Sequence, residues 1–283
     1  MVYDERDCLI AVLPAHRIDN RIISHGGLSY GGFLTDRGMT ASLMLQIFSK
    51  ASAFLMDQEI DFVDYRPVPH IYHQCPAEED LYALFLSGAT MYKRVLVSAI
   101  SRDEAVRPSP GGRRNRRKRK ALRLGIEVRE SRQWSEYWSL LVRNLRERHQ
   151  VEPTHSLDEI CLLESSFPEN IKLFCAYLGS EIQAGVVMYL CPTVGHAQYA
   201  ATTESGRETG ALDLLFSVLI EDTLRHVPYF DFGNSNENRG HFLNRGLIEF
   251  KEGFGARAVV QDNYQIDLRS LDLAVFDANA RSE

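Results

Sequence analysis

A series of three consecutive segments with the two-residue hydrophobic alternation of β-strands constrains the fold of this chain most. The segments cover residues 171–177, 181–190 and 196–203, and short turns at 178–181 and 191–195 separate them. Strands joined by such short turns pair antiparallel, because a parallel neighbour requires a crossover of about a dozen residues. The sequence therefore predicts an antiparallel meander in the second half of the chain.

Helical patterns surround this meander. Ahead of it, Trp134, Trp138, Leu141 and Leu145 recur at helical spacing, and a capping-box sequence at 156–159 precedes a second helix. After it we expect a helix at about 207–225, a buried strand at 229–233, a polar loop at 234–240, a helix at about 241–253 and a strand at 256–264. This order predicts a mixed α/β domain.

The first half of the chain repeats part of this order. Strand patterns cover 9–17, 22–32, 60–65 and 93–100, and helix patterns cover 40–56 and about 78–87. When the Tyr-Gly-Gly at 30–32 is aligned with the Tyr-Ala-Ala at 199–201, Asp64 comes close to Asp231 in the alignment. Asp64 follows Gly32 by 32 residues, and Asp231 follows Ala201 by 30. We therefore expect two copies of one fold, the first of which lacks its opening elements.

The charge distribution indicates where the two copies meet. The formal net charge is −6, but residues 107–123 hold nine basic side chains and no acid, so removing them leaves −15. Two prolines and two glycines open this run, which is typical of an exposed connector leading into a helix. We expect a truncated domain at 1–102, a basic linker and helix at 103–130, and a second domain at 131–283.

Three interpretations of the basic run stay open. The segment Arg113–Lys120 could contact tRNA or another polyanion, hold an anionic donor or a lipid-linked acceptor, or form a solvated helix between the domains. The run has no interleaved aromatic side chains, which argues against sequence-specific recognition of nucleic acid.

The composition is that of an ordinary globular protein, with 45% hydrophobic and 25% charged residues. No apolar run of about 18 residues and no secretory signal pattern is present, so we expect a cytoplasmic protein. The five cysteines are odd in number and scattered, which favours reduced thiols. His70, His73 and Cys75 lack a fourth ligand at suitable spacing, so we expect no metal.

The order of elements resembles the GNAT acyltransferase fold, and its doubling is similar to the FemABX-like branch with twin GNAT-like domains. The segments that carry the resemblance are Glu181–Gly185, Tyr199–Glu204, Arg207–Ala211, Tyr229–Gly233 and Phe250–Gly255. It covers 171–264 well and 9–100 more thinly. The resemblance implies an α/β (α+β) fold of two acyl-CoA N-acyltransferase domains, with mixed central sheets flanked by helices and an incomplete first domain.

The resemblance also implies acetyl-CoA or another acyl-CoA as co-substrate. A pyrophosphate is bound by backbone N–H groups at a helix start, preceded here by small residues. The expected contacts are Thr202, Thr203, Arg207, Glu208, Thr209, Gly210 and Ala211. Leu212 departs from the family pattern, which has Gly or Ala at that position, and a helix start that only packs against its strand is the alternative.

Polar residues follow the strand at 229–233, at the strand end where α/β folds keep their chemistry. Acyl transfer needs a base, oxyanion donors and an acid for the leaving group, and the candidates are Asn234, Ser235, Glu237 and His241. Helix capping is the alternative role of Asn234 and Ser235. The expected substrate contacts are His25, Tyr30, Arg66, His70, Tyr72, Asp231 and, by resemblance, Lys251 as an anion contact.

The sequence thus predicts an acyltransferase that moves an acyl group, in the simplest case acetyl, from acyl-CoA to an amino or hydroxyl group of a sugar or cell-envelope precursor. We expect the reaction in the second half, with the first half closing one wall of the cleft. The alternatives are a Fem-type transferase that uses aminoacyl-tRNA and a non-catalytic binding protein with a decayed GNAT fold.

Overall fold

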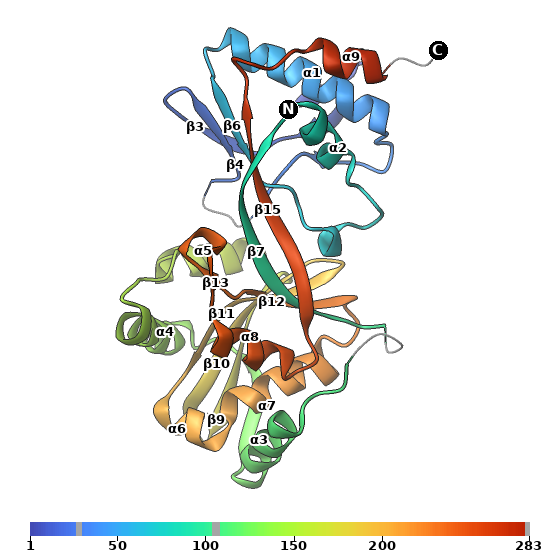
Figure 1. The fold of residues 1–283 in the computed structure, drawn as a ribbon. Coiled ribbons are helices and arrows are strands. Elements are labelled where there is room, and N and C mark those ends of the chain that lie inside the picture. Colours follow the sequence, from blue (N-terminus) through green and yellow to red (C-terminus); the bar gives the residue numbers. More distant parts are fainter. Residues whose placement is uncertain (27–29, 104–107, 281–283) are drawn as a thin grey trace. The chain divides into compact units, whose positions relative to one another are not determined.

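The computed structural model describes residues 1–26, 30–103 and 108–280 (Figure 1). The chain divides into two compact units. Unit 1 comprises Met1–Val95, Asn238–His241 and Val260–Glu283, and unit 2 comprises Leu96–Glu237 and Phe242–Val259. Among the described helices, none combines the length and the apolar character that crossing a membrane requires.

Unit 2 is built around the predicted meander. Its strands are β8 (Ile126–Ser131), β9 (Ile171–Leu178), β10 (Glu181–Leu190), β11 (Val194–Thr202), β12 (Tyr229–Asn234) and the second part of β7 (Thr90–Ser101). They lie in the order β7-β12-β11-β10-β9-β8. Strands β9 to β11 pair antiparallel, as predicted, β8 adds a further antiparallel strand beside β9, and β11 pairs parallel with β12.

Helices cover both faces of this sheet. One face carries α4 (Trp134–His149) and α5 (Leu157–Ser166), and the other carries α3 (Gly112–Arg123), α6 (Glu204–Thr209), α7 (Ala211–Val218) and α8 (Arg245–Glu252) (Figure 1). Alternation along β10 supplies both cores: Val186 and Met188 pack with the α7 side, and Val187 packs with Tyr137 and Trp138 of α4. The predicted capping box at Ser156 and Glu159 starts α5.

Two of the predicted helices have different bounds. The helix expected at 207–225 begins at Glu204 behind the N-cap Thr203, breaks at Gly210 (φ +86°) into α6 and α7, and ends in a π-helical turn at Leu219–Thr223. The helix expected from 241 begins only at Arg245, because Asn244 caps it. The residues before it form the short strands β13 (Asn236–Glu237) and β14 (Phe242–Leu243) and the turn Asn238–Gly240.

Unit 1 contains a smaller version of the same layout. Its sheet order is β3-β4-β6-β15-β7, with β3 (Ala15–Ile18), β4 (Arg21–Ser24), β6 (Phe62–Tyr65) and β15 (Arg257–Asp267). Strand β4 pairs parallel with β6, and the chain between them forms helix α1 (Ala41–Asp57). In the same way β11 pairs parallel with β12, and the chain between them forms α6 and α7. The remaining elements are β1 (Val2–Tyr3), β2 (Leu9–Val12), β5 (Leu34–Thr35), the turn His70–Tyr72, α2 (Glu79–Leu86) and α9 (Ala274–Ala280).

The strand patterns at 9–17 and 22–32 are only partly correct. The first is divided between β2 and β3, and only residues 22–24 of the second are strand, within β4; residues 27–29 lie outside the described part of the chain. The core of unit 1 forms around Phe48 of α1, whose ring contacts those of Tyr65 in β6 and Phe276 in α9.

The expected domain boundaries at 102, 130 and 131 are also corrected. Strand β7 begins in unit 1 and ends in unit 2, and β15 leads the chain back, so residues 96–102 belong to unit 2 and 260–283 to unit 1. The expected linker 103–130 contains α3 and β8, which are part of unit 2. Ala121 of α3 is fully buried in the unit 2 core and Arg114 is also buried, so α3 is no solvated connector.

Candidate functional site

The candidate site of unit 2 lies where two parallel strands separate. Strands β11 and β12 pair at Val194 with Tyr229, Gly195 with Phe230 and His196 with Asp231. Beyond this point β11 continues along β10 to Thr202, and β12 follows β7, with Asn234 opposite Val97. We call this separation the fork.

A cavity of about 1060 Å³ opens beyond the fork, and all its lining residues belong to unit 2. Its walls include Gln198, Thr202, Phe232 and Asn234 from the two strands, Asn144 from α4, Phe216 from α7 and Phe250 from α8. Since α4 and α7 cover opposite faces of the sheet, the cavity reaches both faces through the gap between the strands. A ligand threaded through it would have access to the edges of β11 and β12.

A hydrogen-bonded pair of ionisable side chains stands at the closed end of the fork. The Nδ1 atom of His196 lies 2.8 Å from Oδ2 of Asp231, and its Nε2 lies 3.1 Å from Oε1 of Gln198, which lines the cavity. Asp231 is buried, and its Oδ1 accepts a hydrogen bond of 2.6 Å from the backbone N–H of Gly233. This arrangement fixes the orientation of the imidazole, as a carboxylate does for a general base.

Strand β11 carries a β-bulge at the cavity. Met188 of β10 lies opposite Ala197 and Val187 lies opposite Tyr199, so Gln198 has no partner in the β10–β11 ladder. A bulged residue leaves its backbone groups unpaired and bends its strand. The bulge therefore sets Gln198, two residues after His196, outside the regular pairing of β10 with β11.

Lys251 of α8 contacts the end of β12 at the fork. Its ammonium donates to the backbone oxygens of Gly233 (2.9 Å) and Asn234 (2.5 Å), and the side chain lines the cavity. Burial lowers the pKa of Lys251 to about 8, although the nearby Asp231 carboxylate acts in the opposite direction. The predicted substrate contacts Asp231 and Lys251 thus lie close together.

The cavity wall carries more positive than negative charge. Five cationic side chains line it and only two acidic ones, Asp213 and Glu249. The cations are Arg113, Arg114, Arg117, Arg207 and Lys251. Because the buried Asp213 carboxylate already binds Arg114 and Arg117, the cations left for a ligand are chiefly Arg113, Arg207 and Lys251.

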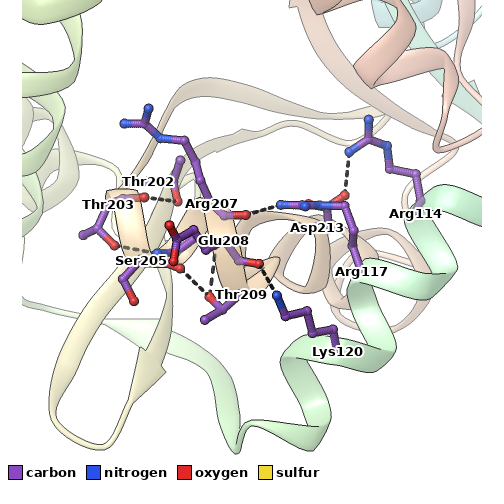
Figure 2. Close-up of polar contacts among 11 residues, drawn as sticks. Arg114, Arg117, Lys120, Thr202, Thr203, Ser205, Arg207, Glu208, Thr209 and Asp213 are labelled. Atoms are coloured by element: carbon purple, nitrogen blue, oxygen red, sulfur yellow. Dashed lines mark hydrogen bonds and ion pairs between the residues drawn. The ribbon is translucent and has the colours of Figure 1, made fainter.

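Figure 2 shows the ion pairs that hold α3 against α7. Arg114 Nη1 lies 2.5 Å from Asp213 Oδ1, and Arg117 Nε lies 2.7 Å from Oδ2. The Arg114 guanidinium also lies over the Phe250 ring, 4.4 Å from its centroid. A buried carboxylate held by two guanidinium groups fixes this part of the cavity wall, since separating Arg114 from Asp213 would leave the buried guanidinium without its counter-charge.

The predicted cofactor segment does not form an open helix start. Arg207 lies in the last turn of α6, and its carbonyl accepts a hydrogen bond from Arg117, while the Glu208 carbonyl accepts one from Lys120 at 2.8 Å (Figure 2). A Cβ atom at Gly210 would lie 2.8 Å from the backbone oxygen of Arg117. Helix α3 therefore covers the turn where the pyrophosphate was expected.

Two of the seven predicted cofactor residues, Thr202 and Arg207, line the cavity. The hydroxyls of Thr202 and Thr203 donate to the Gln183 carbonyl, and Thr209 donates to Ser205. The Arg207 side chain points away from the Asp213 ion pairs (Figure 2), and its Nε is buried without a partner among the described residues. Arg207 is therefore the member of this set best placed to bind a ligand.

The predicted catalytic residues are only partly brought together. Asn234 lines the cavity, but Ser235 is buried beside it, with a hydroxyl that has no partner among the described residues. Glu237 is exposed and accepts a hydrogen bond from Asn244 at 2.8 Å. His241 is exposed and belongs to unit 1, whereas Glu237 belongs to unit 2, and their expected pairing stays a prediction.

The predicted substrate residues of the first half lie within unit 1. The rings of Tyr30 and Tyr72 are 4.6 Å apart, and the Arg66 N–H donates to the Ser24 hydroxyl at 2.9 Å. His25 adopts φ +44° after β4, and His70 is exposed at the start of a 3₁₀ turn. Their role toward an acceptor stays a prediction. Across the described ranges, no group of three or more His, Cys, Asp or Glu side chains could hold a metal ion.

Protein side chains occupy the corresponding fork of unit 1. The Tyr65 hydroxyl donates to Asp80 Oδ2 and accepts from the Phe33 N–H, each at 2.8 Å. It also lies 2.4 Å from where a Cβ of Gly32 would stand. Burial raises the pKa of the Asp80 carboxyl. The placement of the reaction in the second half stays a prediction.

Comparison with known proteins identifies the class. Residues 112–251 match the sequence model of the family described as acetyltransferase (GNAT) domain. Among solved structures, the fold is similar to FemX, with a TM-score of 0.63 and 11% identity over 94% of this chain and 89% of that one. It is also similar to L-PGS from Bacillus licheniformis, with a TM-score of 0.65 and 14% identity over 99% and 87% of the two chains. No protein of curated function has a matching sequence.

The protein is therefore a member of the GNAT superfamily, whose domain occupies most of unit 2. Its fold is the FemABX-like form with two GNAT-like domains. The C-terminal domain of a putative lysylphosphatidylglycerol synthetase from Agrobacterium fabrum shares this fold, with a TM-score of 0.60 and 13% identity over 98% and 86% of the two chains. The predicted resemblance and the predicted mixed α/β class are confirmed.

Sequence reasoning did not find His196 or Gln198, whereas the arginines of α3 that line the cavity lie in the basic run that it named as a possible contact of an anionic donor. His196 opens the predicted strand at 196–203, and Asp231 lies within the predicted strand at 229–233. The order of elements is consistent with two parallel neighbouring strands. Which residues lie opposite each other depends on the strand register, and this register places His196 opposite Asp231. A basic residue and an acid at matching depth in two neighbouring strands were the available signal.

Proposed function

We propose that this GNAT-fold transferase moves an acyl group from acyl-CoA, with acetyl-CoA as the simplest donor, to an amino or hydroxyl group of a sugar or cell-envelope precursor. The fork is the observation that supports this proposal. The His196–Asp231 pair and the bulge at Gln198 lie beside a cavity. The cations of that cavity that do not bind Asp213 suit a phosphate-bearing donor. The acceptor class rests on the similarity to FemX and the synthetases alone.

The chain's own groups suit each step of acyl transfer. His196, held by Asp231 through Nδ1, is the proposed base; its Nε2 exchanges the Gln198 contact for the attacking amine or hydroxyl and removes its proton. The Gln198 N–H is the proposed donor to the oxygen that becomes negative as the new C–N or C–O bond forms. The C–S bond then breaks, and the departing thiolate takes up the proton that His196 removed and leaves as the thiol. Arg113, Arg207 and Lys251 are proposed to bind the donor phosphates.

Calorimetry with CoA and acetyl-CoA tests the donor. We expect binding to the full chain that Arg207→Ala weakens by about ten- to a hundredfold, the loss of a charge-assisted contact. Arg143→Ala is the matched control, since Arg143 is exposed on α4 and outside this cavity. Absence of heat with either ligand would exclude CoA, and turnover of no acyl donor would favour a non-catalytic protein.

The proposed base has a separate test. His196→Gln is expected to lower kcat by about a hundredfold or more and to leave donor affinity unchanged, because the base acts only in the chemical step. Asp231→Asn should lower kcat in the same way, since it would hold the imidazole in the other tautomer. Unchanged kcat in His196→Gln would refute this assignment.

One observation favours aminoacyl-tRNA as a second candidate donor. Helix α3 covers the turn at Arg207–Ala211, so few main-chain groups of this turn are accessible to a pyrophosphate. The same helix carries the basic run Arg113–Lys120. A tRNA donor bound through this run predicts a high 260/280 nm absorbance ratio in the isolated protein and binding that weakens steeply with salt. Native mass spectrometry of the isolated protein distinguishes retained CoA from retained RNA.

A further inference from the structure

Asn144 brings a carboxamide from α4 to the free edge of β11. Its Oδ1 accepts a hydrogen bond from the backbone N–H of Thr202 at 3.3 Å, and the residue is 8% exposed. The next residue, Thr203, donates its N–H to the Gln183 carbonyl of β10 at 2.9 Å. Successive N–H groups of a strand point to opposite sides, so the Thr202 N–H points away from β10 and into the fork.

The amino half of this carboxamide faces the cavity. Asn144 lines the cavity wall, as Thr202 does. Within the described part of the chain the Asn144 Nδ2 has no hydrogen-bond partner, yet it is not enclosed by protein atoms. A main-chain N–H can only donate, so Oδ1 must face Thr202 and Nδ2 is left to donate elsewhere. Asn144 thus takes up the edge donor of Thr202 and presents a new donor to the cavity.

Asn144 lies between the two ends of the site that we assign to the acyl donor. Strand β11 leads from His196 at the fork to Thr202, six residues or roughly 20 Å further on, and Arg207 follows in α6. Acyl-CoA carries its phosphates and its thioester at opposite ends of an arm with two amide groups. An arm that runs from Arg207 to the fork therefore passes Thr202 and the carboxamide bound to it.

We propose that Asn144 is a donor-binding residue, whose Nδ2 donates a hydrogen bond to an amide carbonyl in the arm of acyl-CoA. The inference rests on the acyl-CoA donor proposed above. It gives that donor a contact that aminoacyl-tRNA does not share, because tRNA has no amide-bearing arm between its last phosphate and its ester. The contact positions the arm and takes no part in proton transfer.

Two variants separate this role from a structural one. Asn144→Asp keeps an oxygen for the Thr202 N–H and loses only the donor, whereas Asn144→Ala loses both and leaves the Thr202 N–H open to the arm as a substitute. We expect Asn144→Asp to weaken CoA binding by about ten- to a hundredfold and Asn144→Ala by about fivefold. A purely structural role predicts the opposite order, because only Asn144→Ala leaves the Thr202 N–H without its partner.

Calorimetry of the full chain with two ligands measures the contact. CoA carries the arm, and adenosine 3′,5′-bisphosphate carries phosphates without it. The ratio of the two affinities should fall by about tenfold in Asn144→Asp, while any repulsion between the new charge and the phosphates affects both ligands. Asn170→Asp is the matched control and should leave the ratio unchanged. Asn170 is exposed and outside this cavity, and its Nδ2 also donates to a carbonyl, that of Leu190 at 2.8 Å.

The outcomes distinguish this inference from the proposed function. If the wild type binds CoA and the ratio does not fall in Asn144→Asp, or if Asn144→Ala binds CoA more weakly than Asn144→Asp, the role of Asn144 is overturned and the CoA donor stands. If the wild type binds no CoA, both proposals fall. Urea unfolding followed by the fluorescence of Trp134 and Trp138, which lie in the same helix as Asn144, verifies that each variant is folded.

Discussion

Replacing Lys251 by methionine should change the stability of unit 2 in a pH-dependent way. The side chain is 4% exposed, and burial lowers the pKa of its ammonium from 10.5 to about 8. Between these two values the unfolded chain keeps a proton on Lys251 that the native protein has released, so the wild type gains stability as pH rises. Below pH 8 the full cost of burying the charge is present, and above 10.5 it has gone.

The size of the effect follows from the same two values. From pH 7 to pH 9.5 the protonation difference adds about 2 kcal/mol to the unfolding free energy of the wild type. Lys251→Met lacks this proton, so the stability of the wild type relative to the variant should rise by about 2 kcal/mol over this interval. Other titrating groups are common to both proteins and cancel in the comparison.

Urea unfolding at the two pH values measures this difference. Trp134 and Trp138, the two tryptophans of the chain, both lie in α4, so their fluorescence reports on unit 2. Lys120→Met is the control: its ammonium is exposed, and the difference from the wild type should be the same at both pH values. A constant difference for Lys251→Met would refute the reasoning, because Asp231 and the two main-chain carbonyls would then compensate the burial.

Two further substitutions test the packing of unit 2 by chemical denaturation. Arg114→Met should destabilise the protein by about 2 kcal/mol, because it leaves the buried Asp213 with Arg117 alone, and added salt should not remove the loss; a change below about 0.5 kcal/mol would contradict the structural role of this pair. Gly185→Ala should cost about 2 kcal/mol, because its Cβ would lie 2.4 Å from the buried Tyr137 ring. Restored stability in Gly185→Ala with Tyr137→Leu would support that cause, and its absence would argue against it.

Local sequence patterns predicted most elements of unit 2 correctly. The alternation in residues 171–203 gives the meander, because one buried face on each strand requires a two-residue period. The capping box at Ser156 and Glu159 marks the start of α5, since both hydrogen bonds join residues three apart. These signals are short-range, so no knowledge of the rest of the chain was needed.

The candidate site was less predictable, because it depends on contacts between distant residues. Asn234, Lys251, Asp231, Arg207 and Thr202 were predicted and do lie at the fork or its cavity. The expected helix start at Arg207 was wrong because α3, some ninety residues earlier, donates hydrogen bonds to the carbonyls of that turn. A sequence pattern shows a glycine and an arginine, but it does not show which helix packs on them.

The sequence by itself determined the doubled strand–helix–strand order, the antiparallel meander and the concentration of basic charge before residue 124. Each follows from composition or from periodicity within a few residues. Only the tertiary structure decided that His196 faces Asp231, that Asp213 holds α3 against α7, and that β15 returns the chain to unit 1. Strand register and helix docking depend on the packing of the whole core, so local propensity does not predict them.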